Sequence, residues 1–157
     1  MRVGSGFDVH AFSDDPGRQL VLGGVVIPDG PGLAGHSDAD VVAHALTDAL
    51  LGAAGLGDMG SQFGVDAPDL AGVRSTELLE RAAALVEERW RVSNVDLTIV
   101  AQRPRLAPWQ PRIRATLAGV LGIDEGDVSL KVTSTDGLGS IGRGEGIACW
   151  AVCLLSP

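Results

Sequence analysis

All three histidines of this 157-residue chain fall within its first 44 residues, and two of them combine with an aspartate in a pattern that suits a metal ion. Asp8 and His10 stand two residues apart on a predicted strand, so both side chains project from the same face. His44 is expected on the following helix, one turn after Asp40. Two imidazoles and one carboxylate suit zinc and leave a fourth position open for water or substrate. The spacing predicts a catalytic metal site. The alternative is that no metal binds, with Asp8 in a turn, His10 on the surface and His44 hydrogen-bonded in a helix interface.

The segment from His36 to Asp40 leads into that helix and is a candidate phosphate contact. A helix N-terminus presents unpaired N–H groups and the positive end of the helix dipole. The side chains of His36 and Ser37 would add hydrogen-bond donors there. Ser37 or Asp38 is also the predicted N-cap, and capping is compatible with phosphate binding.

A second polar segment, residues 133–146, joins two predicted strands and is rich in hydroxyl groups and glycines. Glycines let backbone N–H groups approach a ligand closely, and hydroxyls add donors to phosphate oxygens. Asp136 is a candidate magnesium ligand, and Arg143 offers two parallel donors to a diphosphate or a carboxylate. The segment lacks the Gly-Lys-Ser/Thr of a P-loop, and a flexible hairpin loop is the alternative interpretation.

The composition excludes several classes of partner. The chain has 20 acidic and 12 basic residues and a net charge of −8, which argues against nucleic-acid binding because phosphates require a basic face. No uncharged apolar run reaches the ~20 residues of a membrane span, and the first residues lack the apolar core of a signal peptide. Cys149 and Cys153 both lie in one apolar run, which favours a reduced, cytoplasmic protein.

The elements that must position these side chains follow from the hydrophobic pattern and the turn residues. Strands are predicted at 2–10, at 19–27 as two short strands around a Gly23-Gly24 turn, at 94–101, at 128–135 and at 146–155. Helices are predicted at 38–54, at 76–90 with Ser75 as its cap, and at 112–121, and residues 57–74 are expected to be irregular. Strands and helices mix without strict alternation, so we expect one α+β domain over residues 1–157, with helices on one face of a mixed sheet.

The opposite face of that sheet also needs a partner. The run from Ile147 to Leu155 is apolar on both faces of its predicted strand. An oligomer interface is one explanation of this pattern, and a central strand of a monomer is the other.

Four separated motifs occur in order along the chain: Gly6-Phe7-Asp8-Val9-His10, residues 35–45 beginning with Gly35-His36-Ser37-Asp38, Gly57-Asp58-Met59-Gly60, and Gly142-Arg143-Gly144-Glu145-Gly146. Together they resemble the 2-C-methyl-D-erythritol 2,4-cyclodiphosphate synthase family of the non-mevalonate isoprenoid pathway. The resemblance covers essentially the whole chain.

The resemblance implies a homotrimer of ferredoxin-like α+β subunits, with the sheets lining the centre and active sites between neighbouring subunits. It implies a phosphorus–oxygen lyase that converts 4-diphosphocytidyl-2-C-methyl-D-erythritol 2-phosphate to 2-C-methyl-D-erythritol 2,4-cyclodiphosphate with release of CMP. The implied cofactors are zinc, or another divalent transition metal, and magnesium or manganese. The implied ligand is a cytidine diphosphate.

Metal ligands and catalytic residues are implied by the same motifs. Asp8, His10 and His44 match the zinc ligands, and Asp136 matches the magnesium or manganese position, where a glutamate is usual. His36 and Asp136 are the implied catalytic residues. The implied substrate-binding residues are Asp8, His10, His36, Ser37, Asp58, Gly60, Ala101, Arg105, Leu106, Ala107, Thr133, Ser134, Thr135 and Arg143.

Each of these positions has an implied role. His36 and Ser37 match contacts to the substrate phosphates, and Asp58 matches a contact to the erythritol hydroxyls. Residues 101–107 match the cytidine pocket, and residues 133–135 match a stretch beside the nucleotide phosphates. Arg143 and Glu145 match residues near the trimer axis, where some members hold an isoprenoid diphosphate.

Several positions depart from the family pattern. Ala39 stands where glycine is common, and Ser5 stands where some members have histidine. Residues 64–69 differ from the usual form of a mobile loop. Arg105 replaces a frequent lysine, and Ser140 stands where a bulky apolar residue often lines the central cavity.

Two other functions fit the same residues. A zinc-dependent phosphohydrolase would use metal-bound water and yield a linear phosphate. A catalytically inactive trimer that binds a nucleotide or an isoprenoid would take up a cytidine diphosphate without releasing CMP, and the altered residues 64–69 favour it. Cys149 and Cys153 are not candidate nucleophiles, since their predicted strand is buried and no histidine is near them in sequence.

Overall fold

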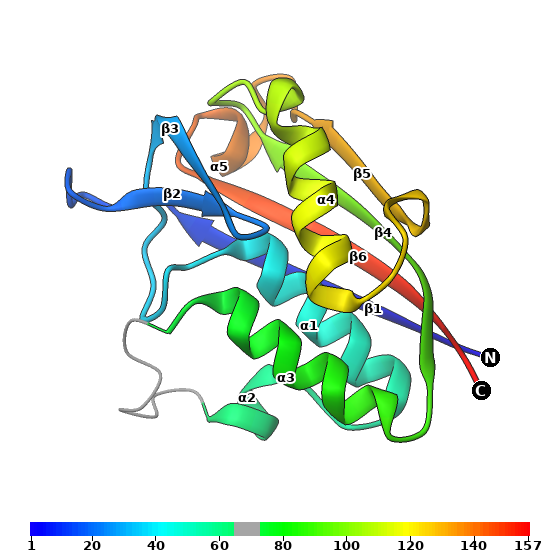
Figure 1. The fold of residues 1–157 in the computed structure, drawn as a ribbon. Coiled ribbons are helices and arrows are strands. Elements are labelled where there is room, and N and C mark those ends of the chain that lie inside the picture. Colours follow the sequence, from blue (N-terminus) through cyan, green and yellow to red (C-terminus); the bar gives the residue numbers. More distant parts are fainter. Residues whose placement is uncertain (65–72) are drawn as a thin grey trace.

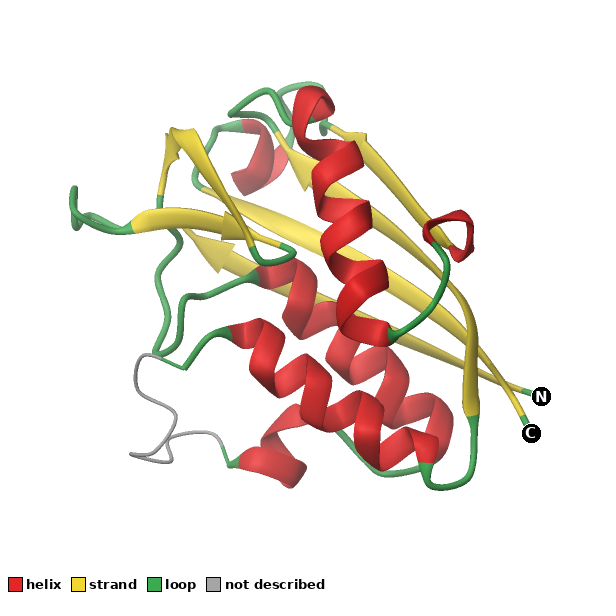
Figure 2. Cartoon of the chain, in the orientation of Figure 1, coloured by secondary structure: helices red, strands yellow, loops and turns green. Residues whose placement is uncertain are grey.

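A four-stranded sheet forms the frame of the protein, and the long helices lie on one side of it (Figure 1, Figure 2). The structure is a computed structural model that describes residues 1–64 and 73–157. Its strands are β1 (Arg2–Ala11), β2 (Gln19–Leu22), β3 (Val25–Pro31), β4 (Arg91–Ala101), β5 (Val128–Thr133) and β6 (Gly146–Ser156). Its helices are α1 (Val41–Ala54), α2 (Met59–Phe63), α3 (Ser75–Glu87), α4 (Gln110–Leu121) and α5 (Gly139–Gly142), with single 3-10 turns η2 (Ala107–Trp109) and η3 (Glu125–Asp127).

The sheet order is β1-β6-β4-β5, and β2 and β3 form a separate hairpin. β6 runs antiparallel to both of its neighbours, whereas β4 and β5 are parallel, so the sheet is mixed. β1 and β6 pair from Arg2 opposite Leu155 onwards, and the two chain ends therefore lie side by side (Figure 1). The prediction of an α+β fold with helices on one face of a mixed sheet is confirmed.

Glycines allow β1 to pack directly on α1. Gly4 and Gly6 are the residues of β1 that face the helix, and both are buried. A Cβ added to Gly6 would lie 2.0 Å from the carbonyl oxygen of Ala45. Any side chain here would hold strand and helix apart, so these two glycines set the distance between the elements that carry Asp8, His10 and His44.

The other face of the sheet is exposed in the single chain. β6 is a central strand, as one of the two interpretations expects, yet Trp150 on it remains 55% exposed. Its neighbour on β1, Phe7, is 53% exposed, and the two rings meet edge to face with 5.5 Å between their centroids. Val3, Val9 and Val152 continue this apolar surface. The strand is thus both central and open on one side.

The predicted N-cap of the first helix is wrong. α1 begins at Val41, and the carboxylate of Asp40, rather than Ser37 or Asp38, accepts hydrogen bonds from the backbone N–H groups of Val42 and Ala43. The same carboxylate also accepts from the N–H groups of Gly23 and Gly24, at 2.8 and 2.7 Å. Ala39 has a left-handed φ of 54°, so the right-handed helix cannot extend back through this residue and begins after it.

The second helix also begins differently from the prediction. Arg74 is the N-cap of α3 and gives no side-chain cap, whereas Ser75, the predicted cap, is the first helical residue. The backbone N–H of Ser75 is instead held by Asp38, 3.2 Å from each carboxylate oxygen. A carboxylate from a distant segment therefore does the capping that the local sequence assigns to serine.

The described part of residues 57–74 contains a short helix, α2, where the sequence predicts an irregular segment. Asp58 and Ser61 form a capping box at its start, with the Ser61 N–H 2.7 Å from the Asp58 carboxylate. The N–H of Met59 also donates to Asp48 on α1, at 2.8 Å. A helix of 5 residues is too short for a hydrophobic period, so the sequence pattern does not reveal it.

The remaining boundaries differ by a few residues. α3 ends at Glu87 rather than at 90, β4 begins at Arg91 rather than at 94, α4 begins at Gln110 rather than at 112, and β5 ends at Thr133 rather than at 135. Of the departure from the family pattern at residues 64–69, all but Gly64 lies outside the described residues.

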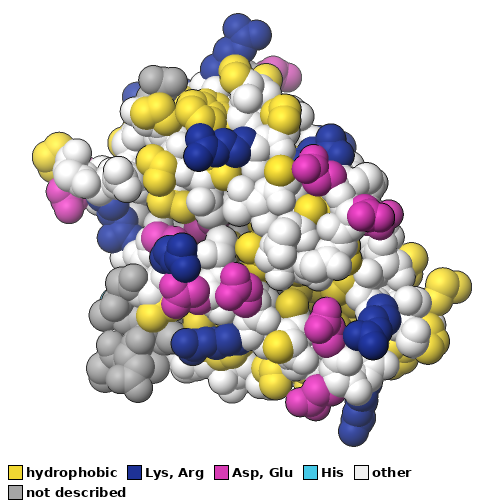
Figure 3. Space-filling model, viewed as in Figure 1, with side chains coloured by type: hydrophobic (Ala, Val, Ile, Leu, Met, Phe, Trp, Pro, Cys, Tyr) yellow, Lys and Arg dark blue, Asp and Glu magenta, His cyan; other side chains and the backbone are white. Residues whose placement is uncertain are grey.

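The helical face of the molecule is polar at its surface. Acidic and basic side chains are interspersed over it (Figure 3). Among the described residues, no helix has the length and apolar character needed to cross a membrane.

Candidate metal centre

Asp8, His10 and His44 converge on one point between β1 and α1. The Asp8 Oδ2 atom lies 3.0 Å from His10 Nε2 and 3.0 Å from His44 Nδ1. The two ring nitrogens are 3.3 Å apart. All three potential ligand atoms lie within 4.8 Å of one another, and among the described residues this is the one such group of three. The side chains that the sequence singled out are therefore close enough to share one ion.

The ring of His10 is oriented by the backbone. Its Nδ1 atom lies 2.6 Å from the carbonyl oxygen of Ala34. A carbonyl oxygen only accepts, so Nδ1 carries a proton and donates it, which leaves Nε2 as the ring nitrogen that faces Asp8. Gly35 makes this approach feasible, because a Cβ there would lie 3.3 Å from Cε1 of the ring.

The charges of this cluster are coupled. Burial by itself would raise the pKa of Asp8, but the hydrogen bonds and charges of His10 and His44 outweigh it, and the pKa falls well below its usual range. The hydrogen bond to Asp8 in turn raises the pKa of His10. The site holds a carboxylate that stays ionised at neutral pH, as a metal ligand must.

The donor set fits a divalent transition metal. Two imidazole nitrogens and one carboxylate oxygen are borderline ligands that suit zinc and its neighbours. The outer ring nitrogen of His10, Nδ1, is hydrogen-bonded to the Ala34 carbonyl oxygen. The outer ring nitrogen of His44, Nε2, lies 2.8 Å from Ser75 Oγ. Ligating histidines in metal sites are held in this way by partners of the outer nitrogen.

A cavity of about 180 Å³ opens beside the cluster. Its lining residues are His10, His36, Ser37, His44, Met59, Gly60, Gly64 and Leu78. Three predicted substrate-binding residues, His36, Ser37 and Gly60, therefore share this space with the histidines of the cluster. Asp58 lies at its edge as the exposed N-cap of α2, and the hydrogen bond from the Ser61 N–H lowers the pKa of its carboxyl group.

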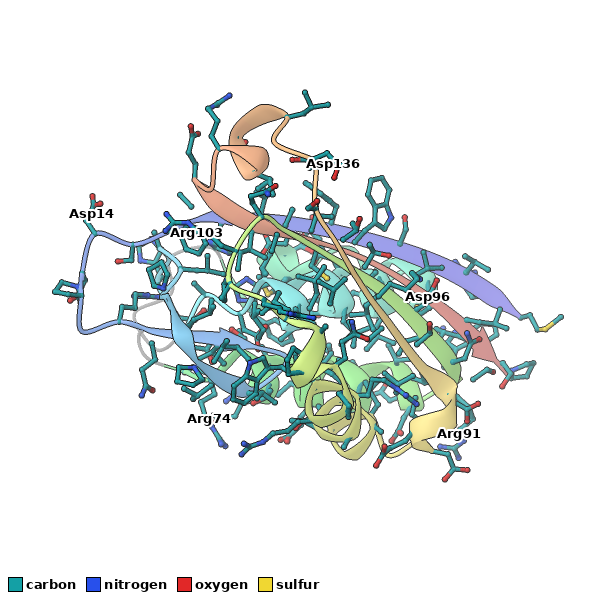
Figure 4. All side chains as sticks on the ribbon, turned by 90° about the horizontal axis from the view of Figure 1, so that it is seen from above. Asp14, Arg74, Arg91, Asp96, Arg103 and Asp136 are labelled. Atoms are coloured by element: carbon teal, nitrogen blue, oxygen red, sulfur yellow. The ribbon has the colours of Figure 1, made fainter. Side chains whose placement is uncertain are left out.

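The other predicted site residues lie elsewhere in the chain. None of residues 101–107 or 133–136 lines this cavity. Leu106 is buried, whereas Arg105 and Ala107 are exposed. Asp136, which has a left-handed φ of 52°, lies in the loop between β5 and α5, on the side of the sheet away from α4 (Figure 4).

The loop that carries Asp136 is ordered by its own contacts. Asp136 accepts a hydrogen bond from the Ser134 hydroxyl at 3.2 Å, and the Thr135 hydroxyl donates to the Leu138 carbonyl oxygen at 2.6 Å. Farther on, Arg143 Nε pairs with Glu145 Oε1 at 2.6 Å, and that pairing lowers the pKa of Glu145. Glu145 lines a second, smaller pocket together with His10, so the end of this loop lies beside the metal cluster whereas residues 133–136 do not line its cavity.

Sequence reasoning missed the partners behind the cluster. The sequence pattern indicates helix caps at Ser75 and Asp38, and it gives no signal for the side chains of Met59 and Leu78. Ser75 is fully buried although it is a serine at the start of a helix, but burial is not visible in sequence. A spacing of 31 residues to His44 gives no local signal either.

Comparison with known proteins points to one family. The model of the YgbB family matches residues 1–156. The 2-C-methyl-D-erythritol 2,4-cyclodiphosphate synthase of Symbiobacterium thermophilum is 51% identical over 157 residues, which cover 99% of each chain. That of Thiobacillus denitrificans is 53% identical over 99% of this chain and 96% of its own. The bifunctional enzyme IspD/IspF of Anaeromyxobacter dehalogenans is 53% identical over 98% of this chain, which spans 39% of that longer protein.

Solved structures agree with this. A 2C-methyl-D-erythritol-2,4-cyclodiphosphate synthase, 36% identical, superposes with a TM-score of 0.89 and covers 99% of this chain and 100% of its own. IspF of Plasmodium falciparum, solved as a complex with CDP, is 34% identical with a TM-score of 0.86 over 99% of this chain and 96% of its own. With matches over nearly its full length in both sequence and fold, the chain belongs to the YgbB family, that of the 2-C-methyl-D-erythritol 2,4-cyclodiphosphate synthases.

Proposed function

We propose that this protein converts 4-diphosphocytidyl-2-C-methyl-D-erythritol 2-phosphate to 2-C-methyl-D-erythritol 2,4-cyclodiphosphate and CMP. The observation that carries the proposal is the convergence of Asp8, His10 and His44 beside a cavity, in a chain of this family. The reaction is an intramolecular phosphoryl transfer. An oxygen of the 2-phosphate forms a bond to the β-phosphorus, and the bond between that phosphorus and the oxygen of CMP breaks.

The reaction needs positive charge and orientation rather than a base. The attacking phosphate oxygen is already an anion at neutral pH, so no side chain has to remove a proton. Anionic groups must instead be brought together, and donors in a partly enclosed site reduce their repulsion. His36 and Ser37 on the cavity wall would bind the substrate phosphates, and Asp58 at its edge would hold the erythritol hydroxyls.

Two metal positions complete the proposed site. Asp8, His10 and His44 would hold zinc or another divalent transition metal, and Asp136 would hold magnesium or manganese. When bound, these ions neutralise charge on the attacked phosphoryl group and on the departing CMP. The chain contributes the orientation, because fixing both ends of one flexible substrate brings the nucleophile to the phosphorus.

The two groups of site residues favour an active site between subunits. Arg105, Leu106 and the rest of residues 101–107 would hold the cytidine, with residues 133–135 beside the nucleotide phosphates. None of them lines the cavity at the cluster. In the proposed assembly, a substrate in the cavity of one chain would reach the cytidine pocket of its neighbour. We infer a homotrimer of ferredoxin-like subunits in which the exposed face with Phe7 and Trp150 lines the centre.

The proposal has two finer features. Arg143 and Glu145, already paired at 2.6 Å, would lie near its axis, where the arginine would meet an isoprenoid diphosphate in a central cavity. The assembly would work in the cytoplasm. The first feature rests on the family resemblance of the motif at residues 142–146, and the second on the two cysteines in one apolar run.

Phosphorus NMR of the purified protein with its substrate and both metals tests the function directly. The expected result is the appearance of CMP together with a cyclic diphosphate, in equal amounts. A linear phosphate product would support a phosphohydrolase instead and overturn the proposal. Binding of CDP without release of CMP from the substrate would overturn it in favour of a binding module.

A further inference from the structure

We propose that Asp38 and Ser75 are positioning residues that hold the ring of His44 with Nε2 protonated, so that Nδ1 is available to a metal beside Asp8 and His10. This inference rests on the proposed function for the identity of the metal centre, but it concerns side chains outside the three ligands. It arises from a chain of hydrogen bonds that connects Asp38, Ser75 and His44.

The first link commits the proton of the serine. The Ser75 hydroxyl makes a short hydrogen bond to the Asp38 carboxylate, and the backbone N–H of Ser75 donates to the same carboxylate at 3.2 Å. An ionised carboxylate only accepts hydrogen bonds. The hydroxyl must therefore donate its single proton to Asp38.

The second link follows from the first. Ser75 Oγ, with its proton used, can only accept from the His44 Nε2 atom 2.8 Å away. Nε2 therefore carries a proton, and Nδ1 is the ring nitrogen left to bind an ion. Nδ1 faces Asp8 Oδ2, at 3.0 Å, and His10 Nε2, at 3.3 Å.

The neighbouring serine is compatible with this arrangement. Ser37 Oγ lies 3.2 Å from Ser75 Oγ and 3.3 Å from His44 Nε2, and it accepts from the Ala39 N–H. Its hydroxyl can donate to the second lone pair of Ser75. Ser75 Oγ then makes one donated and two accepted hydrogen bonds, which is the full capacity of a hydroxyl.

The hydrogen-bond relay from Asp38 through Ser75 to His44 is shielded from solvent. Ser75 is 0% and His44 8% exposed, so water has little access to replace a lost partner. A partner of the outer nitrogen fixes the orientation of a ligating histidine and raises its basicity. Asp38 belongs to the segment before α1 and Ser75 to the start of α3, so the relay also joins these two segments behind the metal centre.

Ser75→Ala tests the relay through metal affinity and through the ring itself. Zinc affinity is measured by competition with a chelator, and the tautomer of His44 by proton–nitrogen NMR of the metal-free protein. The wild type is expected to show the proton on Nε2. The variant should lose that preference and bind zinc about 10- to 100-fold more weakly.

Matched variants separate the relay from general packing. Ser75→Thr keeps the hydroxyl and should recover most of the affinity and the tautomer. Thr47→Ala removes a buried hydroxyl on α1 that donates to the Ala43 carbonyl oxygen at 2.8 Å, and it should leave both the affinity and the tautomer unchanged. Asp38→Asn keeps the shape without the charge, and it should weaken zinc binding even if Ser75→Ala does not fold.

The proposal is overturned if Ser75→Ala and Asp38→Asn bind zinc within about threefold of Thr47→Ala, or if Nε2 of the wild-type ring carries no proton. A wild type that binds no zinc would instead overturn the proposed metal centre. The NMR readout on the metal-free protein decides the relay independently of that result.

Discussion

Gly6 lies so close to Ala45 that a Cβ on the glycine would fall 2.0 Å from the alanine carbonyl oxygen. Gly6 precedes Asp8 by two residues on β1, and Ala45 follows His44 directly on α1. This contact therefore sets the distance over which Asp8 Oδ2 and His44 Nδ1 meet at 3.0 Å. The close packing of β1 on α1 therefore also determines the geometry of the candidate metal centre.

Gly6→Ala is expected to damage stability and metal binding together. The methyl group would meet backbone atoms, which cannot rotate away, so the helix or the strand has to shift. Overpacking of this kind costs about 1–3 kcal/mol, and we expect the upper part of that range. Urea unfolding and the zinc content of the folded fraction measure the two effects.

Gly119→Ala is the control for this substitution. Gly119 is an exposed residue of α4, and a Cβ there would have no neighbour within 4 Å. Its replacement should stabilise the protein by up to about 1 kcal/mol through helix propensity. Equal urea midpoints for the two variants would contradict the packing argument.

His44→Ala should remove bound zinc and turnover while leaving a folded protein. The substitution takes away one of three ligand atoms, and an ion at such a site contributes several kcal/mol of charge stabilisation. We expect turnover to fall at least about 100-fold. Metal analysis and circular dichroism accompany the assay. Turnover at the wild-type level without zinc would show that the cluster is not the catalytic centre.

Ala39→Gly should change the free energy of unfolding by less than about 1 kcal/mol, although it empties a buried position. Relief of the left-handed φ of 54° is worth about 1–2 kcal/mol. The loss of a buried methyl group, about 0.8 kcal/mol, and the greater freedom of unfolded glycine, about 0.5–1 kcal/mol, oppose that gain.

Ala39→Val is the contrasting variant at this position. A branched side chain is poorly tolerated at positive φ, and Ala39 is fully buried. We expect it to destabilise the protein by about 2 kcal/mol or more in urea unfolding. If valine is tolerated as well as glycine, the backbone at residue 39 is not constrained as described.

The two cysteines should be inert in the native protein. Burial raises the pKa of Cys153 to about 11, and burial raises that of Cys149 further still. The reactive thiolate is therefore scarce at about pH 8. A colorimetric thiol reagent should find no free thiol before denaturation and both afterwards. Arg81→Cys on the exposed surface of α3 provides a positive control, and rapid native labelling of the wild type would contradict the prediction.

Trp150→Glu should dissociate the proposed trimer and abolish turnover. The indole is 55% exposed on the open face of the sheet, and a carboxylate would carry a charge into an interface formed there. Sedimentation should change from three chains to one. Val26→Glu, on the exposed side of the β2–β3 hairpin, should change neither property. A trimer that survives Trp150→Glu would place the interface elsewhere.

Local patterns determined a large part of this structure. Asp8 and His10 share a face because side chains alternate along a strand, and that period is visible in the sequence. The apolar pattern around His44 predicts a helix for the same local reason. The pairing of glycines at 23 and 24 predicts the hairpin turn, where φ values of 57° and 75° favour residues without a side chain.

The tertiary structure alone decided which distant groups these elements meet. Ser75 faces His44 across 31 positions of the chain, and Asp38 holds the Ser75 N–H across 37. Asp40 replaces the predicted caps of α1 because it also has to satisfy the N–H groups of Gly23 and Gly24. Such contacts depend on how strands and helices pack, and the local hydrophobic pattern of the sequence does not predict them. The sequence therefore determined which residues could bind a metal, whereas packing decided that their ligand atoms meet and which side chains hold them there.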